Sequence, residues 1–163
     1  MDFGRLTIKS GEAVGAAQEL ARRLGNPEVY PEHLLLALLD QPEGLVPRLI
    51  SAMGADPAAV RRDGEAELSR KPRTTGTAPQ PGQVSLTQRV ARVLEAADRE
   101  ARRMKDEYVS VEHLLVALAE TGSATGAGRV LARHGVTREA FLSALTQVRG
   151  SSWSRSASSR CSG

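Results

Sequence analysis

Apolar residues near the start of the chain recur every three or four positions, which is the spacing of one face of an α-helix. The stripe consists of Ile8, Ala13, Ala17, Leu20, Ala21 and Leu24. It begins after Thr7, a residue type that caps helix starts, and stops at Gly25. A second helix is predicted to start at Pro31, because a proline in the first turn loses no hydrogen bond. Its six consecutive apolar residues, 34–39, predict burial on nearly every side.

Two shorter helices complete this pattern. A third helix is predicted over residues 46–53, with Gly54 as its left-handed C-terminal cap. Asp56 and Pro57 predict the start of a fourth helix, because aspartate is a favoured N-cap and proline is tolerated at the first helical position. The first part of the chain therefore forms a four-helix unit in this prediction.

The chain repeats itself at a distance of 80 residues. Residues 30–38 read Tyr-Pro-Glu-His-Leu-Leu-Leu-Ala-Leu, and residues 110–118 read Ser-Val-Glu-His-Leu-Leu-Val-Ala-Leu. With one extra residue, Met53-Gly54 also matches His134-Gly135. The second copy marks its helix ends with Thr87, Ser110, Gly135 and Thr137. The predicted fold is all-α: two pseudo-symmetric four-helix repeats packed as one domain.

A segment rich in proline and glycine separates the two copies. It has no apolar period and holds Pro72, Gly76, Pro79, Pro81 and Gly82, which predicts a flexible connection over the surface. After Gly150 the chain becomes Ser-rich with little apolar surface, which predicts a disordered tail. The predicted organisation is 1–70 for the first repeat, 71–84 for the linker, 85–150 for the second repeat and 151–163 for the tail.

The composition agrees with a helical, cytoplasmic protein. Hydrophobic residues make up 40% and aromatic residues only 3%, so the core must consist of Leu, Val and Ala. A single cysteine, Cys161, excludes an internal disulfide and a multi-cysteine metal site, and it fits a reducing compartment. The apolar run 34–39 is too short to span a membrane, and the N-terminus lacks the apolar run of a signal peptide. We expect no membrane partner.

Positive charge is concentrated in one region. The net charge is +3, and residues 71–105 alone carry 8 basic and 3 acidic side chains. The cations Arg89, Arg92, Arg99, Arg102, Arg103 and Lys105 form a candidate phosphate-binding face. Acidic residues between them allow ion pairs along one helix, so a solvated surface is the simpler interpretation. The alternative function is a regulatory nucleic-acid-binding protein that uses this 89–105 face and the tail.

The doubled Glu-His-Leu-Leu-x-Ala-Leu word, the two four-helix units and the linker resemble the Clp N repeat, which stands at the front of the Clp unfoldases. The likeness covers residues 1–150. The segments that most resemble the ClpB branch of this family are 5–9, 44–47, 106–110 and 148–150. The resemblance implies a protein-binding module of quality control and the stress response. Its expected partners are unfolded or aggregated proteins, adaptor proteins and a ClpB-type hexameric ATPase.

This chain departs from a complete Clp unfoldase because it holds no Gly-x4-Gly-Lys-Ser/Thr motif. The most similar segment, Gly122–Arg129, lacks the lysine, so we interpret it as a helix-entry loop rather than a phosphate site. We therefore expect no ATPase activity and no cofactor, and a monomer for the isolated chain. An enzyme is the third hypothesis, because no nucleophile and base stand out as a pair.

The resemblance places three polar residues, Thr7, Asp106 and Glu112, at a substrate-contacting groove between the copies. Each also has a structural explanation. Thr7 caps the first helix, Glu112 lies in a first turn where negative charge is favourable, and Asp106 ends a loop. Capping alone and capping combined with substrate contact both remain open at this point.

Recognition of unfolded chains requires an apolar surface, because exposed aliphatic and aromatic side chains distinguish them from folded proteins. The candidate groove walls are Val93, Ala96, Ala97, Glu100 and His113. Glu100 and His113 are polar, which predicts a shallower or more selective groove.

Histidines at equivalent repeat positions, His33 and His113, invite a metal interpretation because each follows a glutamate. Neighbouring residues on a helix point about 100° apart, and the i, i+4 spacing of a zinc-binding histidine pair is absent. We therefore predict ordinary helix-start histidines and no metal site. His134 precedes Gly135 and is predicted to complement the C-terminal end of a helix.

Overall fold

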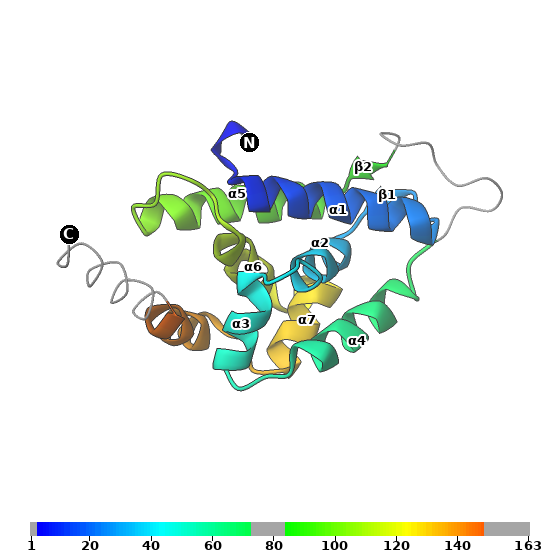
Figure 1. The fold of residues 1–163 in the computed structure, drawn as a ribbon. Coiled ribbons are helices and arrows are strands. Elements are labelled where there is room, and N and C mark those ends of the chain that lie inside the picture. Colours follow the sequence, from blue (N-terminus) through cyan, green and yellow to red (C-terminus); the bar gives the residue numbers. More distant parts are fainter. Residues whose placement is uncertain (1–2, 73–83, 149–163) are drawn as a thin grey trace.

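The computed structural model describes residues 3–72 and 84–148, and within these ranges the fold is all-α apart from one pair of two-residue strands (Figure 1). The first copy of the repeat consists of α1 (Ile8–Leu24), α2 (Pro31–Leu39), α3 (Leu45–Ala52) and α4 (Pro57–Leu68). The second copy consists of α5 (Gln88–Arg103), α6 (Val111–Glu120), α7 (Gly126–Arg133) and a helix over residues 138–148. Two short 3-10 turns, Phe3–Arg5 and Gly122–Ala124, precede α1 and α7.

Capping residues set the helix ends as the sequence predicts. The Thr7 hydroxyl accepts a hydrogen bond from the Ser10 backbone N–H at 3.1 Å, and the Asp56 carboxylate accepts one from the Ala58 N–H at 3.1 Å. At the other end of α1, Gly25 adopts a left-handed φ of 75°. The predicted fold class is confirmed, with α3 beginning one residue earlier than predicted.

The two central helices, α2 and α6, form the core of the molecule. The long α1 packs on α2 and the long α5 packs on α6, while α4 and α7 contact each other on the opposite side (Figure 1). Every residue of α2 is buried, and so are residues 111–118 of α6. Full burial of one leucine side chain contributes about 1.5–3 kcal/mol. The repeated apolar word therefore supplies most of the shared core.

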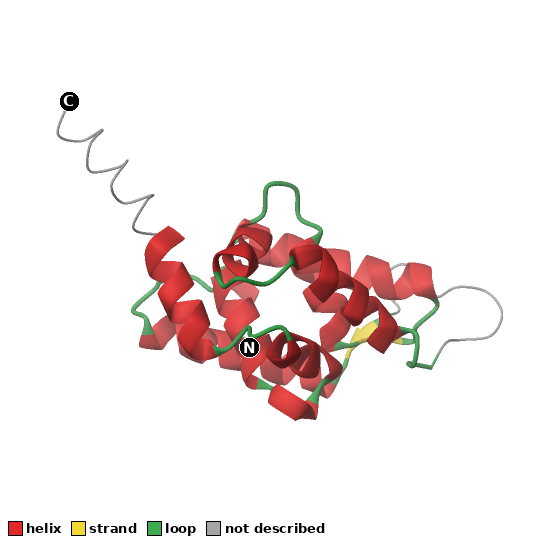
Figure 2. Cartoon of the chain, turned by 90° about the horizontal axis from the view of Figure 1, so that it is seen from below, coloured by secondary structure: helices red, strands yellow, loops and turns green. Residues whose placement is uncertain are grey.

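In each copy, the residues just before the first helix pair with backbone of the other copy. The strand β1 (Glu28–Val29) pairs in parallel with β2 (Ser85–Leu86), as the strands in Figure 2 show. The pseudo-equivalent pairing is a single bridge between Leu6 and Val109. Both pairings are short and join residues far apart in the sequence, so no local periodicity predicts them. They attach the start of α1 to the second copy and the start of α5 to the first.

The Ser-rich tail and most of the linker lie outside the described residues, so the predicted domain boundaries stay predictions. At the start of the predicted linker, the Asn26 side-chain amide donates to the Pro72 carbonyl at 2.9 Å. In residues 3–72 and 84–148, no helix has the length and hydropathy needed to cross a membrane.

Candidate functional site

A groove of about 480 Å³ lies between the two copies, and we call it the inter-copy groove. Three helices begin at its edge: α1 and α3 from the first copy and α6 from the second. Its lining consists of Thr7, Ile8, Lys9, Gln41, Glu43, Gly44, Leu45, Arg48, Ser110, Val111 and Glu112. The Gln41 side-chain amide donates to the Lys9 carbonyl at 2.8 Å and so fastens the loop after α2 to α1.

The apolar part of the groove comes from Ile8, Leu45 and Val111. Ile8 is 82% exposed, which corrects its assignment to the buried stripe of α1. It occupies the first helical position of α1, and its side chain lines the groove instead of packing in the core. An exposed isoleucine beside two further aliphatic side chains is the kind of surface that binds apolar groups.

Two of the three predicted polar contact residues line this groove together. Thr7 caps α1 at one side, and Glu112 lies in the first turn of α6 with 5% exposure. Asp106 does not line the inter-copy groove, and its carboxylate accepts a hydrogen bond from His113 Nε2 at 2.8 Å. Thr7 and Glu112 therefore lie together at the inter-copy groove, whereas Asp106 is the hydrogen-bond partner of the buried His113.

The two helix-start histidines have matched environments. The Nδ1 atom of His113 accepts the Ser110 backbone N–H at 2.8 Å, and the Nδ1 atom of His33 accepts the Tyr30 N–H at 2.8 Å. This fixes the proton of each neutral ring on Nε2, which donates to Asp106 in the second copy and to Asn26 in the first. Burial and the nearby Lys71 charge lower the pKa of His33 to about 4.

The predicted groove walls lie mostly in the interior. Val93, Ala97 and His113 are at most 1% exposed, Glu100 is 3% exposed, and Ala96 is half-buried. The Glu100 carboxylate accepts two hydrogen bonds from Arg138 at 2.8 Å. None of these five residues lines the inter-copy groove, so their substrate contact stays a prediction that this arrangement of the helices does not support.

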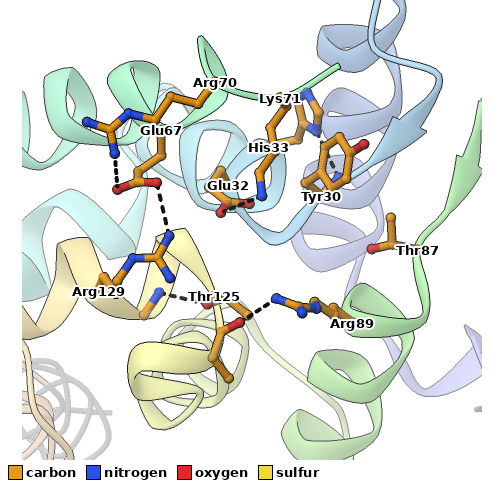
Figure 3. Close-up of polar contacts among 12 residues, drawn as sticks. Tyr30, Glu32, His33, Glu67, Arg70, Lys71, Thr87, Arg89, Thr125 and Arg129 are labelled. Carbon is orange, nitrogen blue, oxygen red and sulfur yellow. Dashed lines mark hydrogen bonds and ion pairs between the residues drawn. The ribbon is translucent and has the colours of Figure 1, made fainter. Parts of the chain in front are cut away.

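A second pocket occupies the pseudo-equivalent position, at the starts of α2, α5 and α7, and we call it the Glu32 pocket (Figure 3). Its volume is about 360 Å³, and its side chains include Tyr30, Glu32, Lys71, Thr87, Arg89 and Thr125. Glu32 is 1% exposed, and its nearest cation is Lys71, whose Nζ lies 3.9 Å from Oε1. The Lys71 ammonium also lies 5.0 Å from the centre of the Tyr30 ring. This pocket is therefore more polar than the inter-copy groove.

Glycines in the first turn of α7 allow close packing. Thr125 caps α7 by accepting a hydrogen bond from the Gly128 N–H at 2.9 Å. A Cβ atom on Gly128 would overlap the Gly122 carbonyl oxygen, and one on Gly126 would overlap the Glu32 carboxylate. Glycine is needed at both positions because other groups already occupy that space.

The basic face of α5 is partly neutralised by its own helix. Arg102 pairs with Asp98 at 3.0 Å, and Arg103 pairs with Glu100 at 3.2 Å.

Within the described residues, no group of three or more His, Cys, Asp or Glu side chains is placed to hold a metal ion.

Comparison with known proteins now identifies the family. The model of the Clp repeat (R) N-terminal domain, Clp N, matches residues 5–134. The chain belongs to the Clp N family. It is 44% identical over 151 residues to the chaperone protein ClpB of Nitratidesulfovibrio vulgaris, which covers 93% of this chain and 18% of that protein. The match to ClpB of Mycobacterium tuberculosis is 40% over 93% of this chain and 17% of the relative. The chain thus spans less than a fifth of the length of these relatives.

Solved Clp N domains share the fold. The N-terminal domain of ClpD from Arabidopsis thaliana has a TM-score of 0.66 at 28% identity, covering 91% of this chain and 97% of that domain. The N-terminal domain of Hsp104 from Candida albicans has a TM-score of 0.73 at 23% identity, covering 90% and 92%. A ClpV N-domain solved in complex with a VipB peptide has a TM-score of 0.67 at 20% identity, covering 83% and 81%.

Apart from Thr7 and Glu112, sequence reasoning missed the residues that line the inter-copy groove of this Clp N domain, among them Ile8, Leu45 and Arg48. One signal was present: Ile8 stands directly after the N-cap Thr7, at the very start of α1. Leu45 and Arg48 carry no such signal, because only the packing of α3 beside α6 brings them to the groove.

Proposed function

We propose that this Clp N domain is the polypeptide-binding module of a ClpB-type chaperone and that the inter-copy groove contacts unfolded or aggregated proteins, or adaptor proteins. The observation that carries the proposal is the exposed Ile8, which meets Leu45 and Val111 in a groove of about 480 Å³. Burial of such side chains against an apolar segment is favourable and non-directional, which suits partners without a common sequence. The ClpV likeness agrees with this proposal, because that N-domain was solved with a bound peptide.

Weak binding is expected from the size of the groove. A short segment buries little area, while association costs several kcal/mol in lost motion and ordering. Useful retention of a client would then come from several modules on one hexameric ATPase ring, which raises the effective concentration of binding sites. In this proposal the ring hydrolyses ATP in the cytoplasm, and the present chain only binds.

A titration of isotope-labelled protein with a permanently unfolded polypeptide tests the proposal. We expect amide shifts that cluster at Ile8, Leu45 and Val111, and loss of these shifts in Ile8→Ser. The matched control is Leu142→Ser, because Leu142 is also an exposed aliphatic residue, at 39%, but lies outside the groove. Equal binding by both variants would contradict the assignment of the groove.

The nucleic-acid hypothesis is tested by the same titration with a short DNA duplex at two salt concentrations. Arg92 and Arg99 are exposed on α5, which favours this second function. Binding through phosphate contacts weakens steeply as salt rises, whereas apolar contacts hold or strengthen. Shifts confined to residues 88–103 that fade with salt would replace the chaperone proposal.

A further inference from the structure

Two arginines at equivalent repeat positions have different partners. Arg48 lies in α3 and Arg129 lies in α7, at the same distance before Gly54 and Gly135. Arg129 is occupied: its guanidinium pairs with the Glu67 carboxylate at 3.2 Å (Figure 3). It also donates to the Ser123 carbonyl at 3.1 Å. Among the described residues, Arg48 forms no ion pair and no hydrogen bond through its guanidinium.

The difference in ion pairing follows from one replaced partner. Glu67 stands in α4, the last helix of the first copy, and the equivalent position in the last helix of the second copy is Val148. Val148 packs against the core and offers no carboxylate. The second copy therefore shows what an arginine at this position binds, and the first copy leaves the same arginine exposed beside the inter-copy groove.

Other charges of the groove restrict where a ligand carboxylate fits. Glu112 is 5% exposed and does not offer its charge freely to solvent, whereas Glu43 is exposed at the rim. Lys9 adds a second cation, held only by a pair with Glu12 at 3.7 Å in which both side chains are exposed. A ligand carboxylate is thus attracted to Arg48 on α3 and to Lys9 on α1, and it is repelled by Glu43 in the loop before α3.

Building on the proposed function, we infer that the inter-copy groove selects polypeptide segments in which an aliphatic residue stands next to an aspartate or glutamate. The aliphatic side chain contacts Leu45 and Ile8, and the carboxylate binds the Arg48 guanidinium. Leu45 and Arg48 are three residues apart on α3, so their side chains are neighbours on one helix face. Guanidinium and carboxylate have matching geometry, which makes an unoccupied arginine a specific receptor for that group.

Three unstructured peptides that differ at one position test this inference: leucine followed by aspartate, by asparagine or by lysine. With the wild-type domain at low salt, the aspartate peptide is expected to bind about two- to fivefold more tightly than the asparagine peptide, as for an exposed ion pair. The lysine peptide should bind least tightly. The preference should shrink as salt is added, because an exposed pair is screened.

Arg48→Gln should remove most of the preference for aspartate over asparagine, because the carboxylate loses its guanidinium partner and only Lys9 remains as a cation of the groove. The matched control is Arg92→Gln, which removes the same charge from an exposed site on α5 outside the groove and should keep the preference. Glu43→Gln should enlarge it.

The results distinguish a failure of the acidic selectivity from a failure of the proposed polypeptide binding at the inter-copy groove. Equal affinities of the aspartate and asparagine peptides for the wild-type domain, with shifts at Ile8, would leave the apolar groove in place and overturn the acidic selectivity. A preference of the same size in Arg48→Gln as in the wild-type domain would also overturn it. Absence of binding by all three peptides and by the unfolded polypeptide would reject the groove itself.

Discussion

The two copies of the repeat place the same histidine in two different electrostatic settings. In the first copy, the His33 ring donates to the neutral Asn26 side chain at 2.9 Å, and in the second copy the His113 ring donates to the carboxylate of Asp106 at 2.8 Å. Both rings also accept the N–H of their helix cap. The backbone role is therefore shared, and only the partner of the second ring nitrogen differs.

The two pockets likewise lie at equivalent helix starts and differ in their side chains. The inter-copy groove presents Ile8 and Leu45, whereas the equivalent first residues of α5 and α7 beside the Glu32 pocket are Gln88 and Gly126. Helix geometry and strand exchange repeat because both copies need them for folding. Side chains at the helix starts diverge because folding constrains them less, which leaves one pocket apolar and the other polar.

The largest expected effect tests whether the two copies form one cooperative unit. Leu35→Ala and Leu115→Ala each empty a fully buried position, so each should lower the free energy of unfolding by about 2–5 kcal/mol. Because the copies exchange their entry strands, either variant should still unfold in one transition in a denaturant titration followed by circular dichroism. Two separate transitions would show that the copies fold independently. Leu142→Ala, at an exposed site, serves as the control and should change little.

The next largest effect is the pH dependence of the protein's stability that results from protonation of His33. His33 has a pKa of about 4 in the folded protein and 6.5 as its ordinary value. Between these values the unfolded chain binds a proton that the folded chain excludes. The contribution of His33 to the free energy of unfolding is therefore fully present above pH 6.5. It is lost as the pH drops toward 4, a total of about 3 kcal/mol.

Asn26→Asp gives the first copy the partner found in the second and should raise the pKa of His33, so that less stability is lost on acidification. The variant also loses the hydrogen bond to the Pro72 carbonyl, so the informative quantity is the slope of unfolding free energy against pH and not its value at one pH. Direct NMR titration of the His33 ring checks the cause. A wild-type His33 that titrates near 6.5 would contradict the interpretation.

Local features of the fold were predictable because they depend on neighbouring residues. The caps at Thr7 and Asp56, the left-handed Gly25 and the buried α2 all follow from residue types within one or two turns. The pairing of Leu6 with Val109 was not predictable, because it joins two copies through two single residues.

The candidate site was only partly accessible to sequence reasoning, for a related reason. Resemblance pointed to Thr7 and Glu112, and the structure places both at the inter-copy groove. It also pointed to Val93 and Ala97, which lie in the core because α5 turns that face toward α6. A family resemblance indicates which positions in the chain to consider. It does not show whether their side chains are exposed, because exposure depends on how α5 is rotated against α6.

The smallest expected effect compares how the copies end their first helix. The Asn26 N–H bonds to the Ala21 carbonyl and the Asp106 N–H to the Ala101 carbonyl, so both helices close with the same left-handed turn. In the first copy the turn residue is Gly25, with φ of 75°, and in the second it is Lys105, with φ of 61°. A side chain in this conformation costs about 1 kcal/mol or more, which glycine avoids.

Lys105→Gly should therefore stabilise the protein by about 0.5–1 kcal/mol, after the greater freedom of glycine in the unfolded chain offsets part of the gain. Gly25→Lys, the reverse exchange in the first copy, should destabilise it by a similar or larger amount. Denaturant midpoints at an unchanged slope measure both effects. If Lys105→Gly proved destabilising, the lysine would contribute more through the negative end of the α5 dipole than its backbone strain costs. The two copies would then differ in what stabilises the turn, although its geometry is the same.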